Sequence, residues 1–452
     1  MAKKLHSSQQ SAGTVAILAL LGSVGAWMLY AGEPLPSEQW GSRFVAALQA
    51  QTRGNTPSSA TSSSGERPTR AERAPVRALK SPYAAYSAVA VDSTRDEIVL
   101  QDENQFNIMI YNRLTDTPPA AAKSEPKRII GGRNTKMGQS NCGVYIDPVS
   151  GDIYSVSNDV ENTLTIFSRE VQGNMPPTRE LNTPHRTFGI AVDEDAQELF
   201  LTVQHPAAVL VWRKMAQGSE APLRILQGDK TQLADAHGIA VDSKNQLMYV
   251  SNRGAGSALK EGMGFSGVPV VEERGVRSWV HPTGPWYEYY RERFVPGSGW
   301  FAPPSITVYP LKASGNTPPL RVIQGPKTHL NWPAHVHIDL ARQELLVADA
   351  IADAILVFRA TDSGDVAPVR VLQGPRSKIK HPHGVFVDEK NGEMVVANLG
   401  NHMATVYPRT AAGDTPPIRT IRSAPEGMLY PMFGKIAALA YDTKRNQILA
   451  PN

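Results

Sequence analysis

Histidine is the residue whose placement in this sequence most directly suggests chemistry. His237 and His383 each lie five residues before an aspartate that recurs along the chain, and His335 lies four residues before it. Three neutral imidazoles that converge suit Zn²⁺, Cu²⁺ or Ni²⁺. Side chains alternate between the two faces of an extended strand, so the one-residue offset of His335 would place its ring on the opposite face from the other two. His337, two residues further on, could take its place. His237, His335 and His383 are therefore candidate metal ligands. The alternatives are rings hydrogen-bonded to neighbouring segments and a ligand pocket without a metal.

A second recurring set of polar residues follows an apolar run that comes after the repeated aspartate. The set comprises Asp102, Asn158, Gln204, Asn252, Asp349 and Asn398. Asn and Asp commonly cap turns by accepting bonds from nearby backbone amides. The alternative is an oxygen-rich ligand site, of a calcium-binding or lactone-hydrolysing kind, for which Asn252, Asp349 and Asn398 are the candidates. No glutamate in register completes such a site.

A third feature is an aromatic-rich insertion at about residues 253–304. Its candidate binding residues are Trp279, Trp286, Tyr287, Tyr290 and Trp300. A loop of this length within a compact domain is usually functional or disordered, and disordered segments are poor in aromatic residues. Tyr and Trp are favoured at binding hot spots. We therefore expect the insertion either to contact a partner or ligand or to pack as a lid on its own domain.

The elements that position these residues belong to a repeat. Strand-like runs that end in aspartate occur seven times, at Asp92, Asp147, Asp193, Asp242, Asp339, Asp388 and Asp442. Successive copies are 46 to 55 residues apart, except for one spacing of 97 residues that contains the insertion. A Pro-x-Arg motif accompanies them, at Arg77, Arg128, Arg179, Arg224, Arg321, Arg370 and Arg419. Two independent series with the same count indicate an internal repeat.

Each repeat reads as four short strands rich in β-branched and aromatic residues, bounded by Gly, Asn, Asp or Pro. This pattern predicts an all-β fold, a seven-bladed β-propeller of four-stranded blades. Strands at 75–80 and 436–452 would combine as the seventh blade and close the ring. A six-bladed ring with leftover strands is the alternative. In a propeller the starts of the first strands and the ends of the second strands meet on one face beside the axis, which would bring the three sets together.

The repeats resemble those of NHL-type and YVTN-type propellers. The resemblance is carried by phrases such as HGIAVD, LMYVSN and SITVY, and by HGVFVD, MVVAN and ATVY, and it covers about residues 70–452. It implies the propeller fold but no single function, since such propellers serve as binding platforms, lactonases and lyases. NHL-type amidating lyases hold a metal with histidines at comparable positions, and on that resemblance His237, His335 and His383 would be the matching ligands.

Charge and cysteine content exclude several classes of protein. The 452 residues carry a net charge of +4, and residues 1–80 alone hold nine Lys and Arg against four Asp and Glu. The rest of the chain has no basic bias, so we expect no nucleic-acid partner. The single cysteine, Cys142, cannot form an intrachain disulfide and is expected to be a small buried side chain.

The N-terminal region predicts export. Residues 1–13 would be a short cytoplasmic N-terminus, and the 18 residues Thr14–Ala31 carry no charge and follow Lys3 and Lys4. This pattern favours a transmembrane anchor with the remainder outside the cytoplasm, in the periplasm or beyond the cell; the alternative is a cleaved signal peptide and secretion. Residues 32–74 are rich in Ser, Thr and Pro and read as a flexible linker to the propeller at 75–452.

Two functional hypotheses follow. The first is a membrane-tethered scaffold that binds a protein or small ligand through one face of the propeller and the aromatic insertion. It is favoured because the sequence contains no recognisable catalytic triad, paired-carboxylate motif, phosphate-binding loop or CxxC pair. The second is a metal-dependent hydrolase or lyase with a histidine-lined central channel. Zinc would be the cofactor at the histidines, and calcium at the carboxylate and amide set.

Overall fold

The computed structural model describes residues 82–138, 141–158, 161–256, 271–273, 276–278, 300–430, 440–442 and 447–449. The chain divides into units Met1–Ala78 and Leu79–Asn452, and every described residue belongs to the second unit. The predicted anchor and linker therefore lie outside the described residues. No helix among the residues described has the length and apolar character needed to cross a bilayer.

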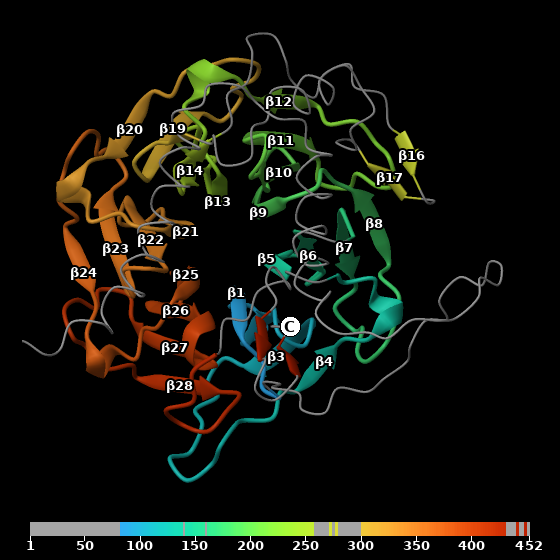
Figure 1. Cartoon of the computed structure of the whole chain (residues 1–452), viewed down its shortest axis with the longest axis vertical. Coiled ribbons are helices and arrows are strands. Elements are labelled where there is room, and N and C mark those ends of the chain that lie inside the picture. Colours follow the sequence, from blue (N-terminus) through green and yellow to red (C-terminus); the bar gives the residue numbers. More distant parts are fainter. Residues whose placement is uncertain are drawn as a thin grey trace, which may run out of the picture. The chain divides into compact units, whose positions relative to one another are not determined.

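The described residues form a β-propeller of six blades, each a four-stranded antiparallel sheet (Figure 1). Blade 1 consists of β1 (Tyr86–Asp92), β2 (Glu97–Asp102), β3 (Asn107–Asn112) and β4 (Arg128–Ile130). Blade 2 consists of β5 (Asn141–Ile146), β6 (Ile153–Ser157), β7 (Thr163–Phe167) and β8 (Arg179–Asn182). Blade 3 consists of β9 (Thr187–Asp193), β10 (Glu198–Val203), β11 (Ala208–Arg213) and β12 (Arg224–Leu226).

The remaining blades follow the same strand order, from the axis outward. Blade 4 consists of β13 (Ala236–Asp242), β14 (Leu247–Asn252), β19 (Ser305–Pro310) and β20 (Arg321–Gln324). Blade 5 consists of β21 (Pro333–Asp339), β22 (Glu344–Asp349), β23 (Ala354–Arg359) and β24 (Arg370–Leu372). Blade 6 consists of β25 (Pro382–Asp388), β26 (Glu393–Asn398), β27 (Met403–Pro408) and β28 (Arg419–Arg422). We call the face where the innermost strands begin the upper face, and the opposite one the lower face.

Short elements lie outside the six sheets. Three two-stranded pairings are β15 (Ala255–Gly256) with β18 (Trp300–Phe301), β16 (Val271–Glu273) with β17 (Val276–Ser278), and β29 (Ala440–Asp442) with β30 (Gln447–Leu449). The 3₁₀ helices are η1 (Arg133–Thr135), η2 (Asp229–Thr231), η3 (Pro326–Thr328), η4 (Pro375–Ser377) and η5 (Leu399–Asn401). The insertion lies between β14 and β19 of blade 4.

The core consists of apolar layers between neighbouring blades. One buried cluster joins Leu164 and Ile166 of blade 2 to Leu201 and Trp212 of blade 3. Another contains residues from both blade 1 and blade 6, and so spans the two ends of the ring. Each blade thus covers its apolar faces with its neighbours on either side, which a single twisted sheet cannot do alone.

The prediction of seven blades closed by combined terminal strands is wrong, and the six-bladed alternative is correct. The innermost strands of blades 6 and 1 already pack together, so closely that a Cβ added to Gly384 would come within 3.1 Å of the Ala88 Cα. This contact leaves no place for a seventh blade. In the described part of the seventh repeat copy, which includes Asp442, the strands are those of the β29–β30 hairpin. Residues 75–80 lie outside the described residues.

The outer strand of every blade accepts a backbone hydrogen bond from the next blade. The backbone N–H of Gly173, Gly218, Gly315, Gly364 and Gly413 each donates to a carbonyl of the preceding outer strand, at 2.6–2.7 Å. At the ring closure Thr117 of blade 1 makes the equivalent bond to Thr420 of blade 6, at 2.8 Å. The contact occupies part of an edge that could otherwise pair with another chain.

The six described arginines of the Pro-x-Arg motif, which exclude Arg77, lie on the lower face and have specific partners. In four blades the arginine pairs with the glutamate that opens the second strand: Arg128–Glu97, Arg224–Glu198, Arg370–Glu344 and Arg419–Glu393. Blades 2 and 4 lack that glutamate, and Arg179 donates instead to Tyr154, while Arg321 donates to the Ala360 carbonyl. These arginines join strands and blades rather than merely placing charge on an edge.

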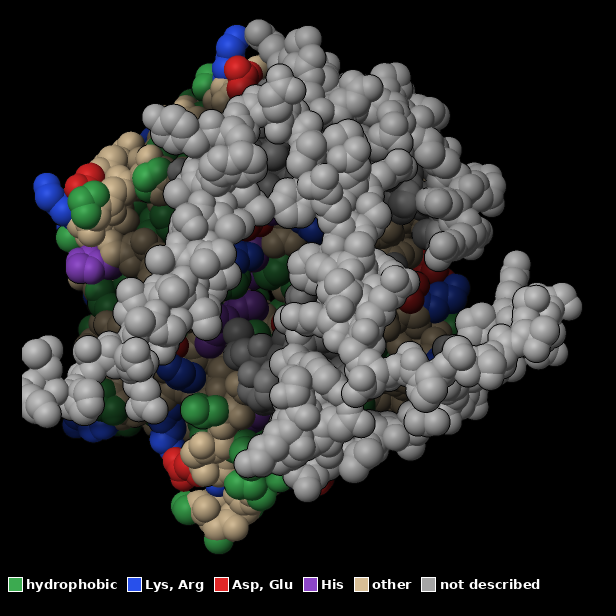
Figure 2. Space-filling model, viewed as in Figure 1, with side chains coloured by type: hydrophobic (Ala, Val, Ile, Leu, Met, Phe, Trp, Pro, Cys, Tyr) green, Lys and Arg blue, Asp and Glu red, His purple; other side chains and the backbone are tan. Residues whose placement is uncertain are grey.

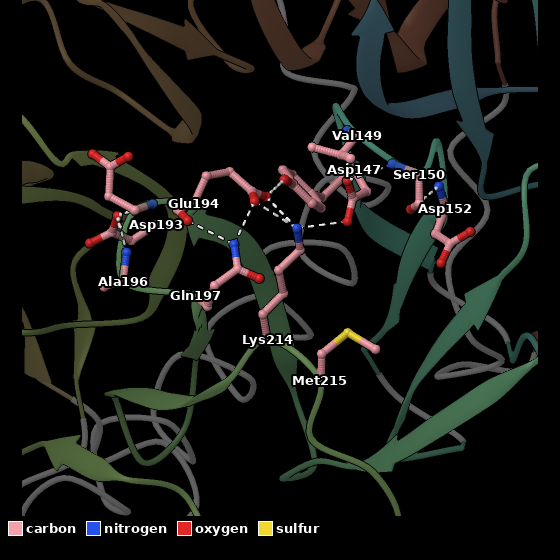
Figure 3. Close-up of polar contacts among 12 residues, drawn as sticks. Asp147, Val149, Ser150, Asp152, Asp193, Glu194, Ala196, Gln197, Lys214 and Met215 are labelled. Atoms are coloured by element: carbon pink, nitrogen blue, oxygen red, sulfur yellow. Dashed lines mark hydrogen bonds and ion pairs between the residues drawn. The ribbon is translucent and has the colours of Figure 1, made fainter.

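Lys214, itself buried, forms an ion-pair network with two carboxylates on the lower face (Figure 3). Its ammonium lies 2.6 Å from Asp147 Oδ2 in blade 2 and 2.7 Å from both Glu194 oxygens. Burial alone would lower the pKa of Lys214, but the two carboxylates outweigh it and raise the pKa. Arg409 of blade 6 donates a hydrogen bond to Asp339 of blade 5. Cations therefore link neighbouring blades at more than one interface.

Candidate functional site

Two positions in each blade define the upper end of the channel, which we call the mouth. The entry position is the residue seven before the repeated aspartate, and the exit position is the residue after the second strand. The exit N–H donates to the entry carbonyl in five blades: Glu103 to Ala85, Gln204 to Arg186, Arg253 to Asp235, Ala350 to Trp332, and Leu399 to His381, at 2.9–3.2 Å. Because five blades share this backbone hydrogen bond, their entry and exit positions are structurally equivalent. Differences between blades at these positions therefore come from the side chains.

Asn252, Asp349 and Asn398 are fully buried at the ends of their second strands. Asn252 Oδ1 accepts from the Ala234 N–H at 3.0 Å, and Asn398 Oδ1 accepts from the Lys380 N–H at 3.1 Å. Asp349 accepts from the N–H groups that precede β21, at 2.7 and 2.9 Å. All three therefore hold the segment that leads into the innermost strand of their own blade. Their assignment to ligand binding gains no support from these contacts.

Blades 2 and 3 depart from this capping scheme. Ser157 and Val203 occupy the equivalent strand ends, and the polar residue comes one position later, at Asn158 and Gln204. Asn158 Nδ2 donates to Gln204 Oε1 at 2.8 Å, and Gln204 Nε2 lies 2.6 Å from His237 Nε2. The one-residue shift converts two caps into a chain of polar contacts across blades 2, 3 and 4.

His237 is 1% exposed and lies at the centre of this network. The amide nitrogen of Gln204 and the guanidinium of Arg253, whose Nη1 is 3.2 Å away, can only donate to His237 Nε2. Asp235 Oδ1, which can only accept, lies 3.3 Å from the same Nε2. Burial lowers the pKa of His237 to about 4 in spite of Asp235, so the ring is neutral at pH 7.

Asp235 is the carboxylate of the mouth in blade 4. Its oxygens lie 3.3 Å from His237 and 3.5 Å from both His205 and Arg253. Burial would raise the pKa of Asp235, but His237 and Arg253 outweigh it and hold the pKa below its ordinary value. The carboxylate remains ionised and balances the charge of Arg253.

Arg253 connects this network to blades 5 and 6. Its Cζ lies 3.3 Å from the centroid of the Trp332 ring, a close cation–π contact. The Trp332 ring is edge-on to His381 at 5.7 Å, and His381 stacks on His383 at 5.0 Å. The mouth thus presents a continuous arc of rings from blade 4 to blade 6. Histidine side chains are visible near the centre of this face in Figure 2.

Several ring nitrogens of the arc are buried and have no hydrogen-bond partner among the described residues. They are His237 Nδ1, His335 Nδ1, His381 Nε2, both nitrogens of His383, and Trp332 Nε1. Buried polar groups in proteins are nearly always paired, because an unpaired one costs about 1–3 kcal/mol. Burial lowers the pKa of His335 to about 4 and that of His383 well below its ordinary value. The arc therefore offers neutral donors and acceptors.

The three predicted metal ligands do not form a metal site in the described structure. No cluster of three or more His, Cys, Asp or Glu residues in the described ranges has the arrangement needed to hold an ion. His335 and His337 share one side of β21, and His337 lies against Phe386 at 4.7 Å. Burial lowers the pKa of His337 to about 3. The suggestion that His337 could replace His335 therefore receives no support either.

The aromatic candidates of the insertion lie largely outside the described residues. Trp279, Trp286, Tyr287 and Tyr290 are among the residues not described, and of Trp300 only the backbone, in β18, is described. The insertion leaves and rejoins the blade at the mouth, where Gly254 donates to the Ala234 carbonyl at 3.0 Å. Its two ends therefore flank Arg253.

Sequence reasoning missed Asp235, Arg253, His205 and Trp332. Each lies one to three residues outside a strand, where no periodic pattern marks it. One signal was available: counted from the repeated aspartate, Asp235, Trp332 and His381 occupy the same position. Cys142 is buried as expected, and burial raises the pKa of its thiol, which suits a structural cysteine rather than a nucleophile.

The arrangement is suited to binding. It combines neutral imidazoles, one guanidinium stacked on an indole and a buried carboxylate, and none of these groups is an activated nucleophile. Comparison with models of known families and with curated proteins finds no match to this chain. The structure therefore identifies the protein through its fold alone, as a β-propeller built from sequence repeats.

Proposed function

We propose that this protein is a non-enzymatic binding propeller that holds a small polar ligand at the mouth, over blades 3 to 6. The observation that carries the proposal is the arc of buried ring nitrogens without partners, beside a guanidinium that is 28% exposed. Ligand sites in proteins are mostly apolar pockets with a few converging polar groups. Here Phe188, Trp332 and the imidazole faces supply the apolar wall.

We further propose that the propeller acts outside the cytoplasm, tethered to the inner membrane by Thr14–Ala31. Support comes from the uncharged run and the preceding lysines in the sequence. The aromatic insertion would add contacts to a ligand or protein partner held on the same face, because both of its ends emerge beside Arg253. Secretion after cleavage of the segment remains the alternative.

The binding proposal is tested by thermal unfolding of the full chain with a panel of small compounds: neutral sugars, amino acids, carboxylates and inorganic phosphate. A ligand that binds only the folded state raises Tm by mass action. We expect at least one class to raise Tm, and the effect to be lost in the His237→Ala/His383→Ala double variant. His329→Asn, at an exposed rim histidine with left-handed backbone, is the matched control. If every class leaves Tm unchanged, or shifts the double variant equally, the proposal is wrong.

A further inference from the structure

We infer that the ligand is an organic carboxylate whose carboxylate group pairs with Arg253 and whose apolar or aromatic body lies along the rings of blades 5 and 6. This inference rests on the proposed binding function and specifies the chemistry of the ligand. It depends on three features: the free edge of the Arg253 guanidinium, the distribution of charge around the mouth, and the apolar wall beside it.

The Arg253 guanidinium is held in one orientation, but only some of its N–H donors have a partner among the described residues. Stacking on Trp332 holds its plane, and Nη1 lies 3.2 Å from His237 Nε2. Its Nη2 and Nε make no hydrogen bond with any other described residue. A planar fork with two unused donors matches a carboxylate in bidentate geometry, and stacking limits the entropy lost when the pair forms.

Asp235 does not already fill that role. Its nearest oxygen is 3.5 Å from Arg253, the pair makes no hydrogen bond, and the same carboxylate is shared with His205 and His237. Burial lowers the pKa of Arg253, and a ligand carboxylate against the guanidinium would offset that desolvation. Arg186, exposed at the entry position of blade 3, has no ion-pair partner among the described residues and adds a second positive charge on this side.

The opposite side of the mouth carries the opposite charge. Glu103 occupies in blade 1 the exit position that Arg253 occupies in blade 4, and in a six-bladed ring these blades face each other. Burial and the neighbouring Asp102 raise the pKa of Glu103 to about 7, and no cation pairs with it in the described part of the chain. Above pH 7, where Glu103 is ionised, a carboxylate ligand is therefore repelled from blade 1 and attracted to blades 3 and 4.

The ring arc supplies the surface for the rest of the ligand. Phe188 packs on the His237 ring at 4.0 Å, and Trp332, His381 and His383 continue the wall toward blade 6. The imidazoles are neutral, so they accept an apolar or aromatic body and can hydrogen-bond to its polar substituents. Inorganic phosphate has no apolar body to contact these rings. It also carries more negative charge than is needed to neutralise Arg253, whose charge is already partly balanced by Asp235.

The test compares benzoate with its neutral isostere benzamide and with inorganic phosphate, by calorimetric titration of the full chain. We expect benzoate to bind at least tenfold more tightly than either compound. Loss of a charged hydrogen-bonded pair corresponds to roughly a tenfold to hundredfold loss of affinity, which we expect for benzoate in Arg253→Gln. Arg253→Lys keeps the charge without the fork and should recover only part of it. Arg359→Gln, at an exposed lower-face arginine, is the control.

The outcomes separate this inference from the proposed function. Equal binding of benzoate and benzamide, stronger binding of phosphate, or unchanged benzoate affinity in Arg253→Gln would overturn the carboxylate inference while leaving a binding mouth in place. The carboxylate inference is also overturned if benzoate does not bind while another class of compound still binds through His237 and His383. If no compound of any class binds at the mouth, the proposed function fails and this inference fails with it.

Discussion

Lys214 on the lower face and His383 at the mouth are both polar and both buried, yet their surroundings are opposite. Lys214 has two carboxylates within 2.7 Å, from two blades. His383 has no hydrogen-bond partner at either ring nitrogen among the described residues. Lys214 therefore holds two blades together, whereas the unpaired ring nitrogens of His383 cost stability, a pattern that functional sites often show.

The largest effect is expected from a substitution that disrupts the Lys214 network of the lower face. Lys214→Met leaves Asp147 and Glu194 without their cation, and removal of one member of a buried ion pair should destabilise the fold by about 3 kcal/mol. Denaturant unfolding measures the change. Arg359→Met removes an exposed cation from the same face and should change stability by no more than about 0.5 kcal/mol. Equal effects of the two substitutions would show that the network contributes no more than a surface pair.

The second prediction concerns pH at the mouth. Because the folded pKa of His237 is about 4 and its ordinary value is 6.5, the unfolded chain binds the extra proton between these limits. Stability therefore falls as pH decreases from 6.5 toward 4, by up to about 1.4 kcal/mol per pH unit for this histidine. Asp102 and Glu103, whose pKa values are raised to about 7, act in the opposite direction.

His237→Gln isolates this contribution, because the acidic residues are shared by both proteins. The free energy of unfolding of the variant, followed from pH 7 to pH 4.5, should fall less steeply than that of the wild type. Identical slopes would contradict a neutral, buried His237.

The smallest expected effect has the opposite sign. His383→Leu replaces a buried ring with unpartnered nitrogens by an apolar side chain, and should leave stability unchanged or raise it by about 1 kcal/mol. The same variant should lose the ligand-dependent shift in Tm. A clear loss of stability would mean that His383 supports the fold and does not serve a ligand.

The sequence predicted the four-stranded repeat and its strand order because each strand is a short run of apolar, β-branched and aromatic residues bounded by turn-forming residues. It did not decide the blade number, because the copy at Asp442 reads like the others and contacts between blades 6 and 1, such as Gly384 with Ala88, show that the ring has already closed. The capping residues show the same limit: Asn158 and Asn252 look alike in the sequence, but a shift of one residue gives them different partners.

By itself, the sequence determined the repeat, the all-β propeller and the concentration of histidines at one end of the innermost strands. These depend on local periodicity and on distances counted along the chain. The tertiary structure decided which side chains meet across blades: Arg253 with Trp332, Gln204 with His237, and Lys214 with Asp147. Such contacts depend on how neighbouring blades pack and on residues just outside the strands, where backbone direction no longer follows from residue spacing.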